Sequence, residues 1–114
     1  MESLTPTTLE ELQKSFDREA GKMQTTMESI LKGLTDAGDD VETLAKVCKS
    51  SREQLLEGYH SIDAIGIRQV EPLTKSDDVE VRAIASSILL SVEEMKMRIL
   101  QQIEQVQEIL FKVR

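Results

Sequence analysis

The chain has 114 residues, enough for one domain with its own hydrophobic core, and we expect a single domain over 1–114, either complete or a fragment of a longer chain. Its formal net charge is −7 and its lysines and arginines are scattered, which excludes a nucleic-acid partner and disfavours a membrane partner with an anionic surface. One Tyr, two Phe and no Trp argue against a β-sandwich core and against modules that stack bases on aromatic rings.

Apolar residues in the first third of the chain recur every three or four positions, which predicts a long amphipathic helix. This stripe consists of Leu9, Leu12, Phe16, Ala20, Met23, Met27, Ile30 and Leu34. We expect Thr5 to cap the helix and Pro6 to take its first position, and Thr8 with Glu11 forms an alternative capping box. Gly21 weakens the helix by about 1 kcal/mol relative to Ala, so the helix either depends on its neighbours or bends there.

A turn is predicted over 35–40, where Gly38 can adopt the left-handed conformation that ends a helix and an Asp can open the next one. The second helix then carries a stripe of Val41, Leu44, Cys48, Leu55, Leu56, Tyr59 and Ile62, with Ser51 filling a slot between them. The single cysteine, Cys48, falls in this stripe and cannot form an internal disulfide. We therefore expect it to be a small core residue of a protein in a reducing compartment, the cytoplasm.

Pro72 bars a helix from continuing past the residue before it, so residues 67–75 are either a frayed extension of the second helix or an ordered loop. Ser76 is the expected cap of the third helix, and Asp77 and Asp78 add negative charge at its positive dipole end. The stripe of the third helix is Val81, Ile84, Ile88, Val92, Met95, Ile99, Ile103, Val106, Leu110 and Val113. Further apolar residues widen this stripe, so we expect more than one helix to cover it: Leu89, Leu90, Leu100, Ile109 and Phe111.

Together these patterns predict an all-α fold, an elongated antiparallel three-helix bundle with helices over roughly 6–34, 40–66 and 77–113. The connections are short and no segment alternates in the manner of a strand. Gly21 and Gly66 are candidate hinges, at which two copies of the chain can exchange a helix. Both a monomer and a homodimer of this kind are compatible with the sequence.

The residue types needed for a catalytic, metal or cofactor site do not come together in the sequence. A single His and a single Cys, twelve residues apart, cannot build a zinc site, and the glycines lack the spacing of a phosphate-binding loop. A phospho-accepting role for His60 is disfavoured, because Ser61-Ile62-Asp63 follows it where phosphotransfer bundles place a basic residue. We therefore expect a protein that is not an enzyme and holds no cofactor, with His60 partly exposed on its surface.

The run from Glu53 to Asp63, EQLLEGYHSID, followed by a loop and a third amphipathic helix, resembles the second helix of BAG domains. These are co-chaperone modules that bind the ATPase domain of seventy-kilodalton heat-shock chaperones. Members carry a Glu on the second helix and an Ile-Asp or Leu-Asp pair ten residues on, matched here by Glu53 and by Ile62-Asp63. The resemblance extends to the size of the chain and to the order of its three long helices.

The resemblance implies a nucleotide exchange factor. The second and third helices of BAG domains hold one lobe of the nucleotide-binding domain outward and so weaken ADP binding. By this resemblance, Glu53 and Asp63 contact basic side chains of the chaperone through charge-assisted hydrogen bonds.

The third helix of the family carries an Arg followed eight residues later by a Gln, and two alignments place this pair differently. If Arg82 is that Arg, Leu90 takes the Gln position. If the core stripes are aligned instead, Ala85 takes the Arg position and Glu93 the Gln position, with Arg82 one turn upstream. The expected contacts from the third helix are therefore Arg82 and Glu93.

The helical stripes fit equally well a structural bundle or coiled-coil subunit of a larger assembly. A partner helix lying along the side of Leu89, Leu90 and Leu100 would favour that alternative. Charge reversal at Glu53 and Asp63 separates the two hypotheses, because a structural subunit should barely respond to it.

Overall fold

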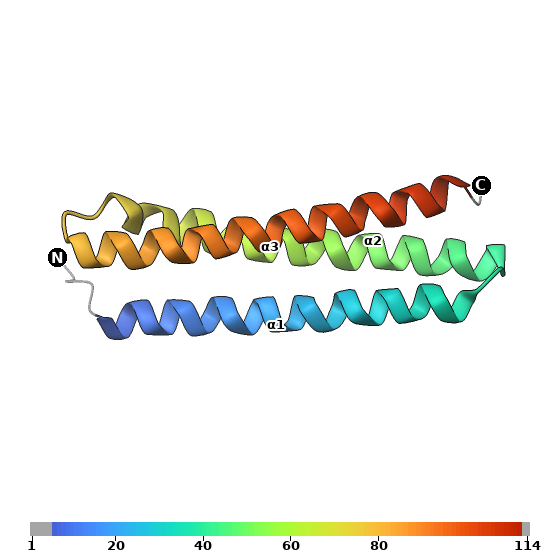
Figure 1. Ribbon diagram of the computed structural model, residues 1–114, viewed down its shortest axis with the longest axis horizontal. Coiled ribbons are helices and arrows are strands. Elements are labelled where there is room, and N and C mark those ends of the chain that lie inside the picture. The colour runs from blue at the N-terminus through green and yellow to red at the C-terminus, as the bar shows by residue number, and fades with distance from the viewer. Residues whose placement is uncertain (1–5, 113–114) are drawn as a thin grey trace.

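The structure, a computed structural model, describes residues 6–112 of the chain, with side chains from residue 9 onward. Three helices follow one another: α1 (Pro6–Ala37), α2 (Val41–Ala64) and α3 (Val79–Lys112). Between α2 and α3 lie a π-helical segment, η1 (Ile65–Val70), and a 3₁₀ segment, η2 (Glu71–Lys75). The helices run up, down and up in a rod of 57 × 19 × 18 Å (Figure 1). The predicted elongated antiparallel three-helix bundle is confirmed.

The turn between α1 and α2 has the predicted chemistry. Gly38 has a φ of 57°, and its N–H donates to the carbonyl of Thr35 at 3.2 Å. Asp40 caps α2, because its carboxylate accepts from the N–H of Thr43 at 3.3 Å. Hydrogen bonds from the backbone and side chain of Thr43 lower the pKa of the Asp40 carboxyl. α1 runs to Ala37, three residues beyond the predicted end.

The cap of α3 is Asp78, and the prediction of Ser76 is wrong by two residues. The Asp78 carboxylate accepts from the N–H groups of Glu80 at 2.9 Å and Val81 at 3.3 Å. Ser76 is still extended, with a ψ of 145°, and its hydroxyl accepts from the N–H of Asp78 instead. The predicted caps at the start of α1 involve Thr5 or the side chain of Thr8, and both lie outside the described part of the chain. The same holds for Val113, the last predicted position of the third stripe.

The connection from α2 to α3 stays helical, which agrees with the predicted extension of the second helix and not with the loop, although the extension is π-helical and then 3₁₀-helical. The N–H of Glu71 donates to the carbonyl of Gly66, five residues back, as in a π-helix. Pro72 then stands in the first turn of η2, where its missing N–H is no loss. The proline ends one kind of helix and begins another, so the chain remains wound until Lys75.

The core runs the length of the rod, and α3 contributes the largest share. Its buried apolar side chains lie opposite those of α1, α2 and η1, and the full set is Leu9, Leu12, Phe16, Met23, Met27, Ile30, Cys48, Leu55, Ile62, Ile65, Val70, Val81, Ala85, Ile88, Val92, Met95, Ile99, Ile103, Val106 and Leu110. Ala20, Leu34, Leu44 and Tyr59 are half-buried, and Ser51 is buried as predicted. Burial raises the pKa of the Cys48 thiol, which therefore stays protonated as a core residue.

Three residues assigned to the core stripes are exposed instead, namely Val41, Leu56 and Ile84. Val41 is the first residue of α2, at the end of the bundle. Ala85 is buried in place of Ile84, because η1 covers this flank of α3 and Gly66 lies against Leu89 and Val92. At the edges of a stripe, a side chain is buried only where a neighbouring segment covers that flank of the helix.

The widened part of the third stripe is only partly covered. Leu89 and Ile109 are half-buried and pack against the core, as expected. Leu90, Leu100 and Phe111 remain exposed, so the prediction that neighbouring helices cover them is wrong for the described part of the chain.

One polar group joins α1 to α3 inside the bundle. The Gln102 side chain is buried, and its Nε2 donates to the backbone carbonyl of Met27 at 3.1 Å. This bond satisfies a buried amide that would otherwise be costly to desolvate.

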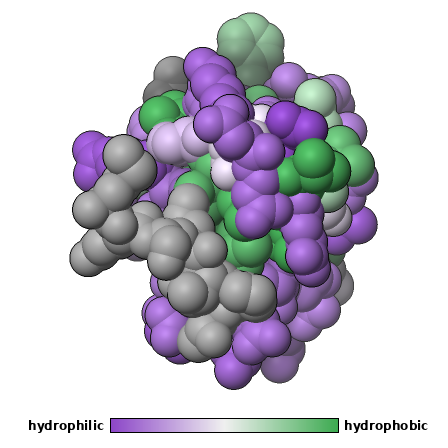
Figure 2. Space-filling view, turned by 90° about the vertical axis from the view of Figure 1, so that its left-hand side faces the viewer, coloured by the Kyte–Doolittle hydropathy of each residue, from purple (hydrophilic) through white to green (hydrophobic). Residues whose placement is uncertain are grey.

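Apolar surface also reaches solvent at one end of the rod. Figure 2 looks onto the end that carries η1, η2 and the start of α3, and it shows hydrophobic side chains between polar ones. Ile67 of η1 and Val79 of α3 are exposed in this part of the chain.

Gly66 is predicted to tolerate no side chain, and Gly21 to tolerate one. A Cβ on Gly66 would lie 2.9 Å from Cγ1 of the buried Val92, whereas a Cβ on Gly21 meets no atom within 4 Å. Gly66→Ala should lower the free energy of unfolding by about 1–3 kcal/mol through overpacking. Gly21→Ala should raise it by about 0.5–1 kcal/mol through better helix propensity. Urea unfolding followed by circular dichroism measures both, and equal effects of the two substitutions would contradict the tight packing of η1.

The capping role of Asp78 is tested by comparing its replacement by Ala with the same replacement at the neighbouring Asp77. Asp78→Ala removes the acceptor for two N–H groups at the start of α3 and should lower the free energy of unfolding by about 1 kcal/mol. Asp77→Ala removes the same charge from the same turn without removing that acceptor, and its effect should be smaller. If Asp77→Ala is the more destabilising of the two in the same unfolding assay, charge and not capping stabilises this end.

Candidate functional site

Asp63 of α2 and Glu93 of α3 meet at one lysine on the seam between the two helices. Lys96 Nζ lies 2.6 Å from Oδ1 of Asp63 and 3.4 Å from Oε1 of Glu93. The same ammonium lies 5.5 Å from the ring centroid of Tyr59, one helical turn before Asp63. The exposed fraction of the side chain is 15% for Lys96 and 27% for Asp63, against 57% for Glu93. We call Asp63, Glu93 and Lys96 the seam cluster.

The electrostatics of the seam cluster leave one negative charge unbalanced. The hydrogen bond to Asp63 raises the pKa of Lys96 above its ordinary value, and the charge of Glu93 adds to this, while partial burial opposes both. Lys96 is therefore a cation at neutral pH and offsets one of the two carboxylates. An incoming base can use the remaining acceptor positions of Asp63 and Glu93, but it competes with Lys96 for Asp63.

Glu53 lies apart from the seam cluster. It is exposed on α2, ten residues before Asp63, which corresponds to about 15 Å along the helix and about 80° around it. His60 is also exposed, and its ring centroid lies 5.9 Å from that of Tyr59. The two acids of α2 that are expected to contact a chaperone thus lie apart, with Glu53 directed outward and Asp63 held at the seam.

Arg82 stands near the start of α3 and is exposed. Its Nη1 donates to the backbone carbonyl of Ser76 at 3.3 Å. Fourteen residues, or about 21 Å, separate it from Lys96 along the helix. The structure therefore joins Asp63 to Glu93 and leaves Glu53 and Arg82 as separate positions on α2 and α3.

Sequence reasoning missed Lys96. Its position directly after the core residue Met95 marks it as a residue at the edge of the buried stripe. A lysine there, three residues after Glu93, could have been recognised as a candidate partner for an acid on a neighbouring helix.

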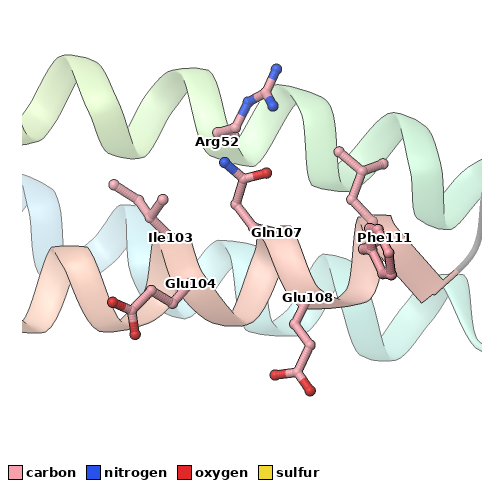
Figure 3. Close-up of a pocket in the computed structure, with 7 residues that line it drawn as sticks. Arg52, Ile103, Glu104, Gln107, Glu108 and Phe111 are labelled. Carbon is pink, nitrogen blue, oxygen red and sulfur yellow. The ribbon is translucent and has the colours of Figure 1, made fainter.

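Farther along the same seam, a hollow of about 590 Å³ opens between α2 and α3. Figure 3 shows Arg52 extending from α2, Ile103 and Gln107 directed toward that helix, and Glu104 and Glu108 directed away from it. The aromatic ring of Phe111 lies at one end of the hollow. The α2/α3 surface thus combines charged residues with an apolar recess.

Within residues 6–112, His, Cys, Asp and Glu side chains form no group of three or more placed to hold a metal ion. In this same part of the chain, no helix combines the length and apolar character that crossing a membrane requires. Comparison with known proteins finds no family model, no curated protein and no solved structure that matches the chain.

The Asp63–Lys96 pair should stabilise the fold measurably, and its contribution should depend on pH. A double-mutant cycle with Asp63→Asn and Lys96→Met should give a coupling energy of about 1 kcal/mol at neutral pH, because both side chains are largely shielded from water. The pKa of Lys96 is raised on folding, so this stabilisation is complete below the unfolded pKa of 10.5 and is lost as pH rises through the higher folded value.

The matched control is the pair of Lys112 and Glu108, which lie 3.3 Å apart with both side chains mostly exposed. Its coupling energy should be no more than about a few tenths of a kcal/mol. Equal coupling energies for the two pairs would contradict the special position of the seam cluster.

Proposed function

We propose that this chain is a co-chaperone that docks through α2 and α3 onto the ATPase domain of seventy-kilodalton heat-shock chaperones and promotes ADP release. The observation that carries the proposal is the convergence of Asp63 and Glu93, from two helices, on one side of a rod-shaped bundle. The resemblance of residues 53–63 to BAG domains supplies the partner. A buried, protonated Cys48 is compatible with the reducing cytoplasm in which we place the protein.

In this proposal the bundle acts by differential binding. It accelerates release only to the extent that it binds the open form of the nucleotide-binding domain more tightly than the closed form. Glu53 is exposed and can form an ion pair directly with a basic side chain of the chaperone. Asp63 can bind a basic side chain of the chaperone only by sharing its carboxylate between that side chain and Lys96. Its contribution to affinity is therefore smaller than that of an unpaired acid.

A second candidate function is that of a structural subunit in a helical assembly. The observation in its favour is the set of large apolar side chains on α3 that the described residues leave uncovered, among them Leu90, Met97 and Phe111. Large exposed apolar side chains aligned on one helix mark protein–protein contacts more often than solitary ones do.

The co-chaperone proposal is tested by the release of a fluorescent ADP analogue from a seventy-kilodalton heat-shock chaperone. The chain should accelerate release, and Glu53→Ala should weaken the effect about tenfold, because the loss of a charge-assisted hydrogen bond costs about 1.5–3 kcal/mol. Asp63→Asn and Glu93→Gln should each weaken it less. Glu28→Ala on α1, which removes an exposed acid away from the α2/α3 surface, should leave it unchanged.

Circular dichroism of each variant separates lost docking from lost folding. Acceleration that survives in the triple variant Glu53→Ala, Asp63→Asn and Glu93→Gln would reject the proposed surface. No acceleration and no binding by the unchanged chain would reject the co-chaperone function and leave the structural subunit as the candidate.

A further inference from the structure

A second apolar stripe runs along α3 on the side turned away from the core. Positions that recur at alternating steps of four and three residues lie on one side of a helix. Counted from the start of α3, most such positions are apolar, and they are Val79, Ala83, Leu90, Met97, Leu100 and Phe111. All of them are exposed, and the exposed fraction is 63% for Leu90, 58% for Met97 and 81% for Phe111. We call these residues the outer stripe. It extends over almost the whole of α3.

The remaining positions of the same spacing are polar, and the charged ones among them are acidic. Ser86, Glu93, Glu104 and Gln107 occupy these positions, and Glu108 borders the stripe. A helix lying on the outer stripe would therefore meet apolar side chains interrupted by negative charge.

Bases of α3 do not neutralise these glutamates fully. Lys96 lies 3.4 Å from Glu93 but closer to Asp63, at 2.6 Å, so its charge is shared between two carboxylates, and Lys112 lies 3.3 Å from Glu108 at the border of the stripe. Arg98 is offset from Met97 by about 100° around the helix, on the flank away from the outer stripe. Among the described residues Glu104 forms no ion pair and Glu93 shares its base with Asp63, so part of the negative charge of the stripe is available to a partner.

The hollow beside the C-terminal half of α3 continues this surface toward α2. Phe111 belongs both to the outer stripe and to the lining of the hollow, with Glu108 between it and Glu104 along α3 and Arg52 on α2 (Figure 3). A bulky apolar side chain of a bound helix can enter here, which adds an anchor at one end of the stripe.

Pairing of α3 with α3 of a second copy does not complement the outer stripe. Parallel pairing of two α3 helices places Glu93 and Glu104 each against its own copy. Antiparallel pairing that sets Leu90 against Leu100 places Glu93 against Met97, where burial of a charge is costly, and leaves Glu104 opposite a serine. In neither arrangement does Glu93 or Glu104 meet a base.

We propose that the outer stripe docks a basic amphipathic helix of a different protein. The helix presents large apolar side chains to Leu90, Met97 and Leu100 and Lys or Arg side chains to Glu93 and Glu104. These two glutamates are eleven residues apart, so the bases of the partner are expected about three helical turns apart. The inference rests on the second proposed function, that of a structural subunit, and names the class of partner for it.

The probe is a fluorescein-labelled synthetic helix of about four heptads, with Leu at the a and d positions and Lys beside them. A second peptide carries Glu in place of every Lys. Fluorescence anisotropy with the full chain should show binding of the basic peptide, weakened by salt, and much weaker binding of the acidic one.

Two sets of variants separate apolar docking from general charge attraction. The double variant Leu90→Ser and Met97→Ser leaves the net charge unchanged and should weaken binding of the basic peptide about tenfold or more. Glu93→Gln with Glu104→Gln should weaken it severalfold and reduce its dependence on salt. Leu31→Ser, which removes an exposed apolar residue of α1, is the matched control and should have no effect.

Each contrary result has a defined meaning. Equal binding of the two peptides, reduced by the serine variant, would keep the structural-subunit function but overturn the basic partner. Failure of both peptides to bind would overturn the proposed partner. Binding of the basic peptide unaffected by the serine variant would overturn docking on the outer stripe. Self-association in sedimentation experiments that the serine variant abolishes would assign the stripe to a second copy and overturn the proposal.

Discussion

The core-facing side of α3 is the constraint on which the rest of the bundle depends. It is apolar from Val81 to Leu110, and each residue left open to water along that length would cost hydrophobic free energy. α1 is nearly as long and covers one flank. α2 ends at Ala64, well short of the start of α3, and η1 and η2 continue the cover from there. The π-helical and 3₁₀ connection therefore covers the apolar side of α3 in the same way as the regular helices do.

This constraint leaves two distinct surfaces on α3, and the two proposed functions use different ones. The flank toward α2 carries the seam cluster, where polar groups satisfy one another close to the core. The side opposite the core carries the outer stripe, whose apolar groups have no cover from the described residues of the chain. Glu93 borders both surfaces, so occupancy of one changes the electrostatic environment of the other.

Periodicity in the sequence was sufficient to predict most of the core, because residues such as Phe16, Leu55 and Ile99 lie at the centre of their stripes. It was insufficient at the edges, where the choice between Ile84 and Ala85 depends on the position of η1. The seam cluster joins Asp63 to a lysine thirty-three residues away, and only the packing of α2 on α3 reveals that pair. The fit of Gly66 against the core is likewise a property of packing and has no local signal.

The π-helical turn of η1 has a further consequence for the chain that follows it. A π-turn holds one residue more than an α-helical turn, so it acts as an insertion absorbed within a continuous helix. If the same residues 65–70 were wound as a regular α-helix instead, without loss of a residue, everything downstream would be rotated by about 100°. Val70 would then leave the core, and η2 would enter the next turn out of phase with α3. The extra residue thus sets the angular phase at which the chain turns back along the bundle.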